Sequence, residues 1–227
     1  MTTLFIANYS TKLYNIFEVI ILKKSNYVDI INVLKKTYPE AKCSLDFNKP
    51  FELVVAVMLS AQCTDERVNK TTPALFSKYP TIESFANADI TDLEKMIHPC
   101  GFYKNKAKNI IETAKKVLND FDGIVPSNME DLLTLPGVGR KSANVIMLEV
   151  FGIAQGVAVD THCKRISNRL GLSKESDPTK IEFDLIQKFP PETLKDVNHL
   201  FMYFGRDICI ARKPKCEQCP LRNFCKL

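Results

Sequence analysis

The sequence lacks several features that define common protein classes, and each absence narrows the interpretation. No apolar run reaches the roughly 20 residues that a membrane-spanning helix needs. The longest run, Leu13–Leu22, is interrupted by Asn15 and Glu18, which predicts an amphipathic helix rather than an anchor. No segment resembles a secretion signal, and this argues against disulfide bonds. There is no tryptophan, so intrinsic tryptophan fluorescence cannot follow the binding of a partner.

Strands, repeats and histidine clusters are absent as well. No run of alternating polar and apolar residues is bounded by hairpin turns, and there is no internal repeat or low-complexity linker. Three histidines occur without the spacing of metal ligands, and no chemistry is assigned to them: His98, His162 and His199. With 227 residues, 45% hydrophobic and 25% charged, the composition is that of a globular protein. A net charge of +5 permits nucleic acid as a partner without demanding it.

The positive signals are almost all helical. Apolar spacing and helix-start or helix-stop residues predict helices over 27–38, 51–62, 64–79, 90–97, 104–119, 128–135, 140–151 and 161–170, with another starting at Pro178. The segment 51–62 is apolar on nearly every face, so we expect it to run through the core. Ser127 and Glu130 form a capping box that opens the helix 128–135. The predicted fold class is all-α.

Four cysteines near the end of the sequence form its most informative group: Cys209, Cys216, Cys219 and Cys225. Their spacing, C-x6-C-x2-C-x5-C, lets a short stretch of backbone circle one metal centre, and a single C-x2-C favours an iron–sulfur cluster while leaving zinc open. The same stretch is basic: Arg206, Arg212, Lys213, Lys215, Arg222 and Lys226. A metal centre among positive charges suggests a staple for a DNA-contacting surface. The other cysteines are interpreted as small apolar side chains: Cys43, Cys63, Cys100 and Cys163.

The second informative feature is the segment LPGVGRKSANVI at residues 135–146, which joins the capped helix to the helix 140–151. Pro136 stops the first helix, and Gly137 and Gly139 allow backbone angles and close approaches that a side chain would block. A tight turn with outward amides at a helix N-terminus can bind a phosphate without reading a base. A plain helix–turn–helix packing unit is the alternative. Arg140 and Lys141 directly after the turn favour phosphate binding.

This hairpin, the segment Val159–His162 and the terminal cysteine spacing together resemble endonuclease III, the iron–sulfur branch of the helix-hairpin-helix DNA glycosylases. The resemblance covers roughly residues 26–227. It implies two helical lobes flanking a DNA-binding cleft, with a C-terminal loop whose four cysteines hold a [4Fe–4S] cluster. The lobe that carries the cluster is expected at 26–48 and 150–227, and the lobe with the hairpin (about 128–150) at 49–149. Residues 1–25 form an extension of unknown role.

The resemblance also implies a base-excision-repair enzyme with two activities, a DNA glycosylase that removes oxidised pyrimidines and an AP lyase that cleaves 3′ to the abasic site. Lys141 would be the nucleophile, because an amine that attacks C1′ leaves a Schiff base that permits β-elimination. The helix dipole and partial burial are expected to favour its neutral form. From the residues alone, Lys141 could instead meet a phosphate, as Arg140 would.

Asp160 would stabilise positive charge on the sugar, and it could also cap the helix 161–170. Lys141 and Asp160 are 19 positions apart, one more than the family spacing, and we expect the extra residue in the loop 153–156.

DNA contacts are expected from three segments. In the hairpin, Gly137, Val138, Gly139 and Arg140 would meet the phosphate backbone. When a nucleotide flips out of the duplex, the hole must be filled. Gln62 could pair with the orphaned base, and Phe102 stands where the family has an apolar wedge, expected to be leucine. A core contact is the alternative for Phe102. Three lysines follow and could track the backbone or simply be solvated: Lys104, Lys106 and Lys108.

Two other functions remain open at this point. One is a monofunctional mismatch glycosylase of the same fold that removes adenine or thymine. The other is a non-catalytic iron–sulfur protein that binds DNA. Lys141 argues against the first, because such glycosylases usually lack a lysine at this position, and Lys141 and Asp160 together argue against the second. The expected partner is double-stranded DNA that contains damaged pyrimidines or abasic sites, bound by a monomer with no membrane involved. With no targeting signal recognised, the expected location is the cytoplasm, at the nucleoid.

Overall fold

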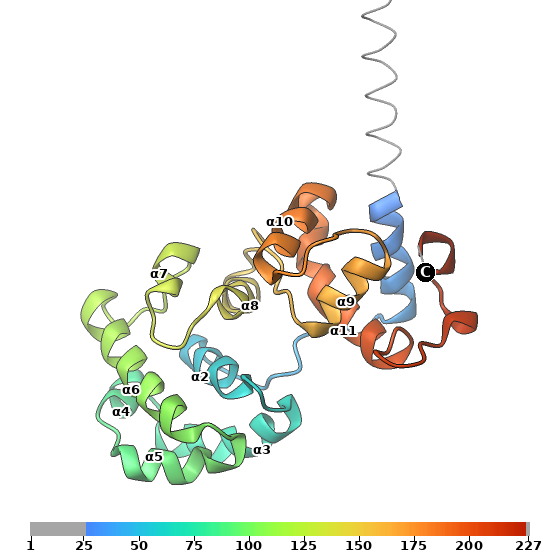
Figure 1. Cartoon of the computed structure of the whole chain (residues 1–227). Helices are drawn as coiled ribbons and strands as arrows, with labels where there is room; N and C mark the ends of the chain where they lie inside the picture. Colours follow the sequence, from blue (N-terminus) through green and yellow to red (C-terminus); the bar gives the residue numbers. More distant parts are fainter. Residues whose placement is uncertain (1–25, 226–227) are drawn as a thin grey trace, which may run out of the picture. The chain divides into compact units, whose positions relative to one another are not determined.

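The computed structural model describes residues 26–225, and every regular element among them is helical (Figure 1). The predicted all-α class is confirmed for this part of the chain. Two compact units are present: one is Lys42–Ala154, and the other combines residues 26–41 with 155–225. No helix among the described residues is long and apolar enough to cross a membrane. The predicted extension 1–25, with its apolar run Leu13–Leu22, and the basic residue Lys226 lie outside the described residues.

The unit Lys42–Ala154 contains the predicted hairpin. Its elements are α2 (Pro50–Ser60), α3 (Asp65–Lys78), α4 (Ile82–Ala86), α5 (Ile90–Ile97), η1 (His98–Cys100), α6 (Tyr103–Asp120), α7 (Met129–Leu133) and α8 (Arg140–Phe151) (Figure 1). α4 and α5 pack against α6, while α2 packs against α3, α6 and α8. The core of this unit therefore forms around α2.

α2 is central because almost all of its faces are apolar. Pro50 occupies the first turn, where its missing N–H leaves no hydrogen bond unmade. All residues from Phe51 to Leu59 are buried, as the pattern predicts. Among them is Glu52, whose carboxylate accepts hydrogen bonds from the amides of Asn48 at 2.7 Å and Lys49 at 3.2 Å. The buried charge is thereby hydrogen-bonded rather than left unsatisfied.

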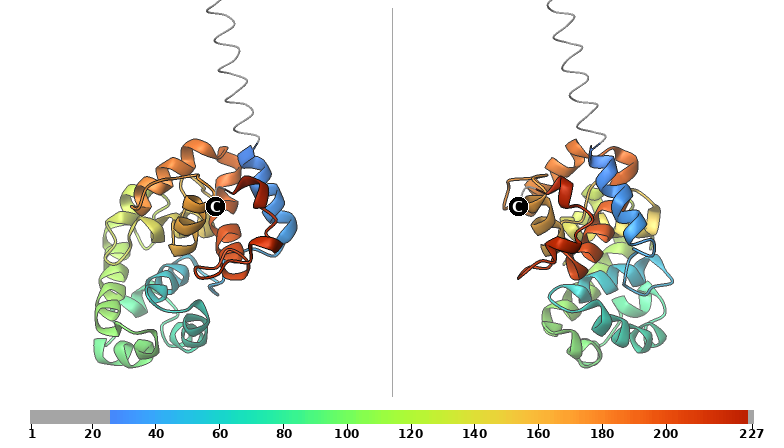
Figure 2. Two further views of the ribbon diagram at one scale, coloured as in Figure 1. Left: turned by 45° about the vertical axis from the view of Figure 1, so that its right-hand side comes forward. Right: turned by 90° about the vertical axis from the view of Figure 1, so that its right-hand side faces the viewer.

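The other unit joins the helical segment 26–37 to the later part of the chain. Its elements after residue 155 are α9 (Thr161–Arg169), α10 (Pro178–Lys188), η2 (Pro191–Thr193), α11 (Leu194–Asp207), η3 (Cys216–Gln218) and η4 (Arg222–Phe224). Figure 2 shows the blue segment beside the orange and red helices of this unit. The Tyr38 hydroxyl donates a hydrogen bond to Asp207 at 3.0 Å, and Lys35 pairs with Asp196 at 2.7 Å. Residues far apart in the sequence thus share one core.

Gly205 allows α9 and α11 to pack closely. A Cβ at this position would lie 2.8 Å from Nδ1 of His162 and 2.9 Å from Nη2 of Arg165, which is closer than real Cβ contacts. The same Arg165 nitrogen donates to the carbonyl of Gly205 at 2.9 Å. This contact fixes α9, the helix that begins directly after Asp160.

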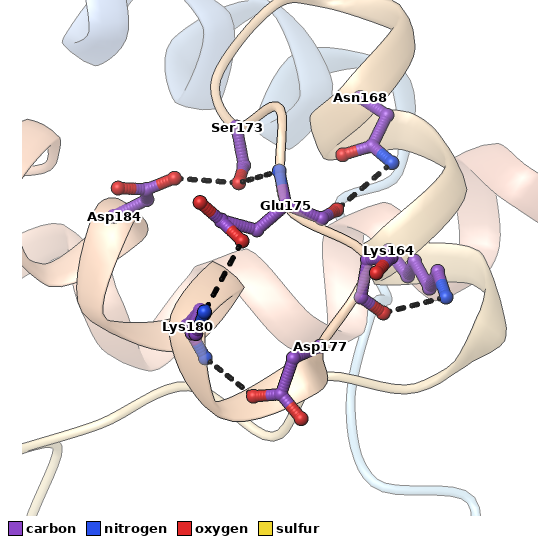
Figure 3. Close-up of polar contacts among 8 residues, drawn as sticks. Lys164, Asn168, Ser173, Glu175, Asp177, Lys180 and Asp184 are labelled. Atoms are coloured by element: carbon purple, nitrogen blue, oxygen red, sulfur yellow. Dashed lines mark hydrogen bonds and ion pairs between the residues drawn. The ribbon is translucent and has the colours of Figure 1, made fainter.

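The connection between α9 and α10 is held by hydrogen bonds from side chains to the main chain (Figure 3). The Lys164 ammonium donates to the carbonyl of Ser176 at 2.7 Å, and the Asn168 amide donates to the carbonyl of Glu175 at 3.3 Å. Asp177 is the N-cap of α10 and accepts a bond from a first-turn amide at 3.0 Å. The loop is therefore held by polar side chains of the helix before it and capped at the start of the helix after it.

Candidate functional site

The hairpin consists of α7, a short turn and α8. α7 begins after Asn128, whose Oδ1 accepts a hydrogen bond from the amide of Asp131 at 2.9 Å. The predicted capping box of Ser127 and Glu130 is therefore wrong by one residue. Asn128 has extended backbone, which places its short side chain over the first-turn amides. The motif is nevertheless formed where the sequence places it.

The two glycines of the turn have different structural roles. Gly137 has φ = +80°, in the left-handed region that glycine reaches without a steric penalty. A Cβ there would lie 2.8 Å from Nδ2 of Asn109 and 3.0 Å from Cε of Met58, so the turn also needs a small residue. Gly139 is the N-cap of α8 in extended backbone, and nothing lies within 4 Å of the place where its Cβ would be. Gly137 serves packing, whereas Gly139 leaves the helix end open.

The N-terminus of α8 offers amide donors for an anion. Gly139 has no side chain, so no side-chain hydrogen bond caps the first turn. Val138 is buried and anchors the turn, and Arg140 is half-buried at the start of the helix. Amides aligned at a helix N-terminus favour a phosphate oxygen through hydrogen bonds and through the helix dipole. This geometry is the one expected for phosphate binding by the hairpin.

Lys141 lies in the first turn of α8, immediately after the hairpin. Its side chain is exposed, so the partial burial expected from the sequence is not present in the described chain. Exposure leaves its Nζ accessible from solvent. Lys141 belongs to the unit Lys42–Ala154, whereas Asp160 belongs to the other unit.

Asp160 follows the buried segment Val157–Val159 and is the N-cap of α9, as predicted. Its Oδ1 accepts a hydrogen bond from the amide of Cys163 at 2.7 Å. Asn198 of α11 donates to a carbonyl of the buried segment, which holds the chain before the cap. Burial lowers the pKa of the adjacent His162, although the negative charge of Asp160 opposes this shift. The carboxylate is thus half-buried and fixed in position.

Gln62 and Phe102 share an uncommon backbone conformation. Their φ angles are +55° and +49°, a region that residues other than glycine seldom adopt. α2 ends at Ser60, so the prediction that Gln62 is helical is wrong. Phe102 is 64% exposed, which excludes the core contact considered from the sequence. Both side chains line one hollow of about 200 Å³, together with Asn109 and Gly137. The structure therefore brings the two predicted gap-filling residues together.

The three lysines after Phe102 do not behave alike. Lys104 and Lys108 are exposed, in agreement with solvated or backbone-tracking side chains. Lys106 is only 6% exposed, and its ammonium donates to main-chain carbonyls. The interpretation of Lys106 as a solvated or DNA-tracking lysine is therefore wrong, because its hydrogen-bond partners lie inside the protein.

The four terminal cysteines line one small cavity with apolar neighbours that include Leu170, Phe204 and Ile208. Among residues 26–225, no three His, Cys, Asp or Glu side chains lie close enough to hold a single metal ion. A [4Fe–4S] cluster binds each cysteine to a different iron, so its ligands stand further apart than those of one zinc ion. Burial raises the pKa of the Cys219 thiol, and the other three cysteines raise it further. A cationic core that stabilises four thiolates fits this donor set.

Two arginines of α9 fasten the cysteine loop. Arg169 donates from Nη1 to Sγ of Cys209 at 3.3 Å and to the carbonyl of Ile210 at 2.8 Å, and from Nη2 to the carbonyl of Ala211 at 3.0 Å. Arg165 donates from Nε to the carbonyl of Cys209 at 2.9 Å. The sequence prediction missed both, because it considered only the basic residues near the cysteines. Their spacing of four residues on one face of a helix is the signal that could have indicated them.

Two protein-family models match the chain. The model of the HhH-GPD superfamily base excision DNA repair proteins matches residues 55–191, a range that contains the hairpin, Lys141 and Asp160. The model of the iron–sulfur binding domain of endonuclease III matches residues 209–225, from the first to the last of the four terminal cysteines.

Similar proteins of known name extend over nearly the same length. Endonuclease III of Synechocystis sp. is 52% identical over 203 residues, which cover 89% of this chain and 93% of that protein. A solved structure of a non-covalent endonuclease III–DNA complex matches with a TM-score of 0.84 and 39% identity, covering 89% of this chain and 95% of that chain. A trapped endonuclease III–DNA covalent intermediate matches with the same TM-score and identity.

Proposed function

The chain belongs to the endonuclease III family, and from that membership we propose which residues carry out its reaction and which bases it removes. The protein is a bifunctional DNA glycosylase and AP lyase of base excision repair, acts on DNA, and has a [4Fe–4S] cluster as its cofactor. The nucleophile is Lys141, and its partner carboxylate is Asp160. The bases removed are oxidised pyrimidines in duplex DNA, and the enzyme also acts on abasic sites.

Lys141 carries the covalent step. Its neutral amine attacks C1′ of the damaged nucleotide, and the base departs with the electrons of the glycosidic bond and takes up a proton. The amine then becomes a Schiff base with the opened sugar, which acidifies the C2′ proton. Removal of that proton expels the 3′ phosphate by β-elimination. The observation that carries this assignment is the exposed amine in the first turn of α8, next to amides placed for a phosphate.

Asp160 acts on charge and protons. A carboxylate held at a helix N-cap is positioned before the substrate binds, so it does not reorganise as positive charge develops on the sugar. It can also relay the protons that leave and enter around the Lys141 amine. The bond from the Cys163 amide and the buried segment before Asp160 support this role by limiting its movement.

DNA is held by the hairpin and by the two loop residues. The turn Gly137–Gly139 and Arg140 bind the phosphate backbone through amides and charge. When the damaged nucleotide leaves the stack, Gln62 pairs with the orphaned base and Phe102 fills the gap. Their exposure and the hollow they share support a joint role at that gap. Phenylalanine is larger and flatter than the expected leucine, so the wedge adds stacking on the neighbouring bases.

The cysteine loop contributes binding rather than chemistry. Its four cysteines hold the cluster, which when bound supplies a covalent staple for the loop. Exposed basic side chains surround the staple: Arg212, Lys213, Lys215 and Arg222. These charges are suited to the DNA backbone. We propose that the enzyme works as a monomer in the cytoplasm, on the DNA of the nucleoid.

Borohydride trapping tests the assignment of Lys141. Wild type, Lys141→Gln and the control Lys115→Gln, an exposed lysine of α6, are each incubated with borohydride and a duplex that carries one oxidised pyrimidine. Because borohydride reduces a Schiff base to a stable amine, wild type and the control should give a covalent protein–DNA adduct. Lys141→Gln should give none.

The other outcomes are equally informative. An adduct that survives in Lys141→Gln would place the nucleophile on another amine. If cluster-loaded wild type gives no adduct but releases the base, as revealed by alkaline strand cleavage, the chain is a monofunctional glycosylase. Asp160→Asn, tested in the same assay, should slow adduct formation by about 10²- to 10³-fold. An unchanged rate in that variant would remove Asp160 from the mechanism.

A further inference from the structure

Lys106 is a charged side chain enclosed by the protein. It is 6% exposed, and its Nζ donates hydrogen bonds to the carbonyls of Leu59 at 2.8 Å, Ala61 at 2.8 Å and Cys100 at 2.9 Å. A buried ammonium is tolerated only when its N–H groups are satisfied, and these three bonds use all three of them. Burial lowers the pKa of this amine. The chain therefore accepts an unfavourable environment at this position to make these three contacts.

The three carbonyls belong to the ends of two helices. Leu59 and Ala61 lie at the C-terminus of α2, and Cys100 is the last residue of η1. The last carbonyls of a helix have no partner within the helix, and they carry the negative end of its dipole. One ammonium placed between two such ends satisfies carbonyls of both. Lys106 thus ties the end of α2 to the end of η1.

Each of these two helix ends is followed in the sequence by one of the two residues proposed to fill the gap. Gln62 follows Ala61, and Phe102 follows Cys100 after the single residue Gly101. Both residues have positive φ, a strained conformation that persists only where the surroundings enforce it. Lys106 itself lines the hollow that the two side chains share. It is therefore a contact that joins the two strained turns directly.

We propose that Lys106 is a positioning residue, which holds Gln62 and Phe102 at one fixed separation so that they enter DNA as a single unit. The proposal rests on the function proposed above for those two residues. Lys106 acts through the backbone of both turns and not on the reacting atoms. Without it, the two turns lose the ammonium that they share, and the energy of ordering them must be supplied when DNA binds.

The variant Lys106→Met tests this proposal, with Lys115→Met as the matched control on the exposed face of the same helix. Methionine keeps an unbranched apolar side chain as far as the ε position and removes the ammonium with its donors. The first substrate is a duplex with one oxidised pyrimidine opposite 2-aminopurine, whose fluorescence reports how the orphaned base is contacted. The second is single-stranded DNA with a preformed abasic site, which has no opposite base and no gap to fill.

We expect base excision from the duplex to fall about 10²-fold in Lys106→Met, since small misplacements of positioning groups have effects of that size. The fluorescence change of 2-aminopurine on binding should be lost. Cleavage of the single-stranded abasic DNA should stay within about twofold of wild type. Thermal unfolding and the visible absorption of the cluster establish that the variant is folded.

Two results would overturn the proposal. One is duplex excision and a fluorescence change that both match the control. The other is an equal loss on both substrates, which would make Lys106 a residue of general structural importance only. If Lys106→Met does not fold, Lys106→Gln is measured instead, because it keeps an amide donor. It should lose duplex excision selectively, and an equal loss on both substrates would again overturn the proposal.

Two more variants separate this proposal from the assignment of the gap-filling residues. If Gln62→Ala and Phe102→Ala both leave duplex excision unchanged, the assignment of those residues fails. If they lower it while Lys106→Met does not, only the positioning role fails. When both ideas hold, adding Gln62→Ala to Lys106→Met should cost much less than it does in wild type, because residues that act as one unit are non-additive.

Discussion

Two regions of the molecule are held by the same kind of contact: the loops that carry Gln62 and Phe102, and the loop of the four cysteines. They differ in whether a cofactor is also needed. In both, a cation on a helix binds main-chain carbonyls: Lys106 in the first case, Arg165 and Arg169 in the second. In the loops of Gln62 and Phe102, the carbonyls that Lys106 binds find their hydrogen-bond donor within the protein. The cysteine loop still presents four thiols to a common cavity. The loops of Gln62 and Phe102 are therefore preformed, whereas the loop of the four cysteines depends on a cofactor.

The largest effect is expected from Cys219→Ser, which removes one of the four cysteines of the cofactor-dependent loop. Loss of one ligand should abolish the iron–sulfur absorption and lower the Tm by about 10 °C, because metal binding supplies folding free energy. Visible absorption and thermal unfolding measure both. Hydrogen exchange should show new opening in residues 155–225, while α2 and α6 stay protected. Equal loss of protection in both units would contradict the distinction.

A smaller effect is expected from Gly137→Ala, which disturbs the preformed region, because Gly137 lines the hollow shared by Gln62 and Phe102. Alanine at φ = +80° is strained, and its Cβ would meet Asn109 and Met58. We expect a loss of about 2–3 kcal/mol in the free energy of unfolding. Gly139→Ala is the matched control, because its Cβ would stand in open space. It should unfold like wild type and yet bind duplex DNA more weakly, since its methyl group obstructs a phosphate. If both variants unfold alike, the packing role of Gly137 is wrong.

The smallest effect is expected from the protonation of His162, which makes the stability of the cluster-bearing unit depend on pH. Burial lowers the pKa of His162 from its ordinary value of 6.5, with Arg165 and Arg206 acting in the same direction and Asp160 opposing them. The unfolded chain therefore binds a proton at higher pH than the folded chain. Stability from this residue is complete above pH 6.5 and decreases as the pH falls below it.

Between pH 7 and pH 5, wild type should lose about 1–2 °C more in Tm than His162→Asn does. The measurement is thermal unfolding of both proteins, loaded with cluster, across that range. Asparagine is polar but does not titrate, so His162→Asn is the non-titrating control for wild type. Parallel curves for the two proteins would show that His162 makes no contribution.

The helices could be predicted where the sequence marks both ends. The predicted helices 90–97 and 140–151 agree with α5 and α8, because apolar periodicity and flanking polar, glycine or proline residues define them. α4 is not predicted, since five residues are too few to show a period. α2 is shorter than predicted, because the capped end at Ala61 depends on Lys106, which is distant in sequence.

The residues of the site also divide into those that the sequence predicts and those that it does not. The hairpin, Asp160 and the four cysteines could be found because their motifs are contiguous in the sequence. Lys106 and Arg169 could not, because they bind main-chain carbonyls that any residue offers, 45 positions away at Ala61 and 41 positions away at Ile210. Lys106 also sits in a row of exposed lysines, Lys104 and Lys108, from which only the fold distinguishes it. Carbonyl acceptors leave no signature in the sequence.

The two-part origin of the cluster-bearing unit has a consequence for synthesis. Residues 42–154 are continuous, so this unit has its whole core as soon as they leave the ribosome. The segment 26–38 emerges earlier, but its partners Phe189, Asp196 and Asp207 emerge much later. Domains generally fold as units during translation. The early segment therefore completes its contacts only after the middle of the chain has been synthesised, and the four cysteines, which follow α11, become available to a cluster later still.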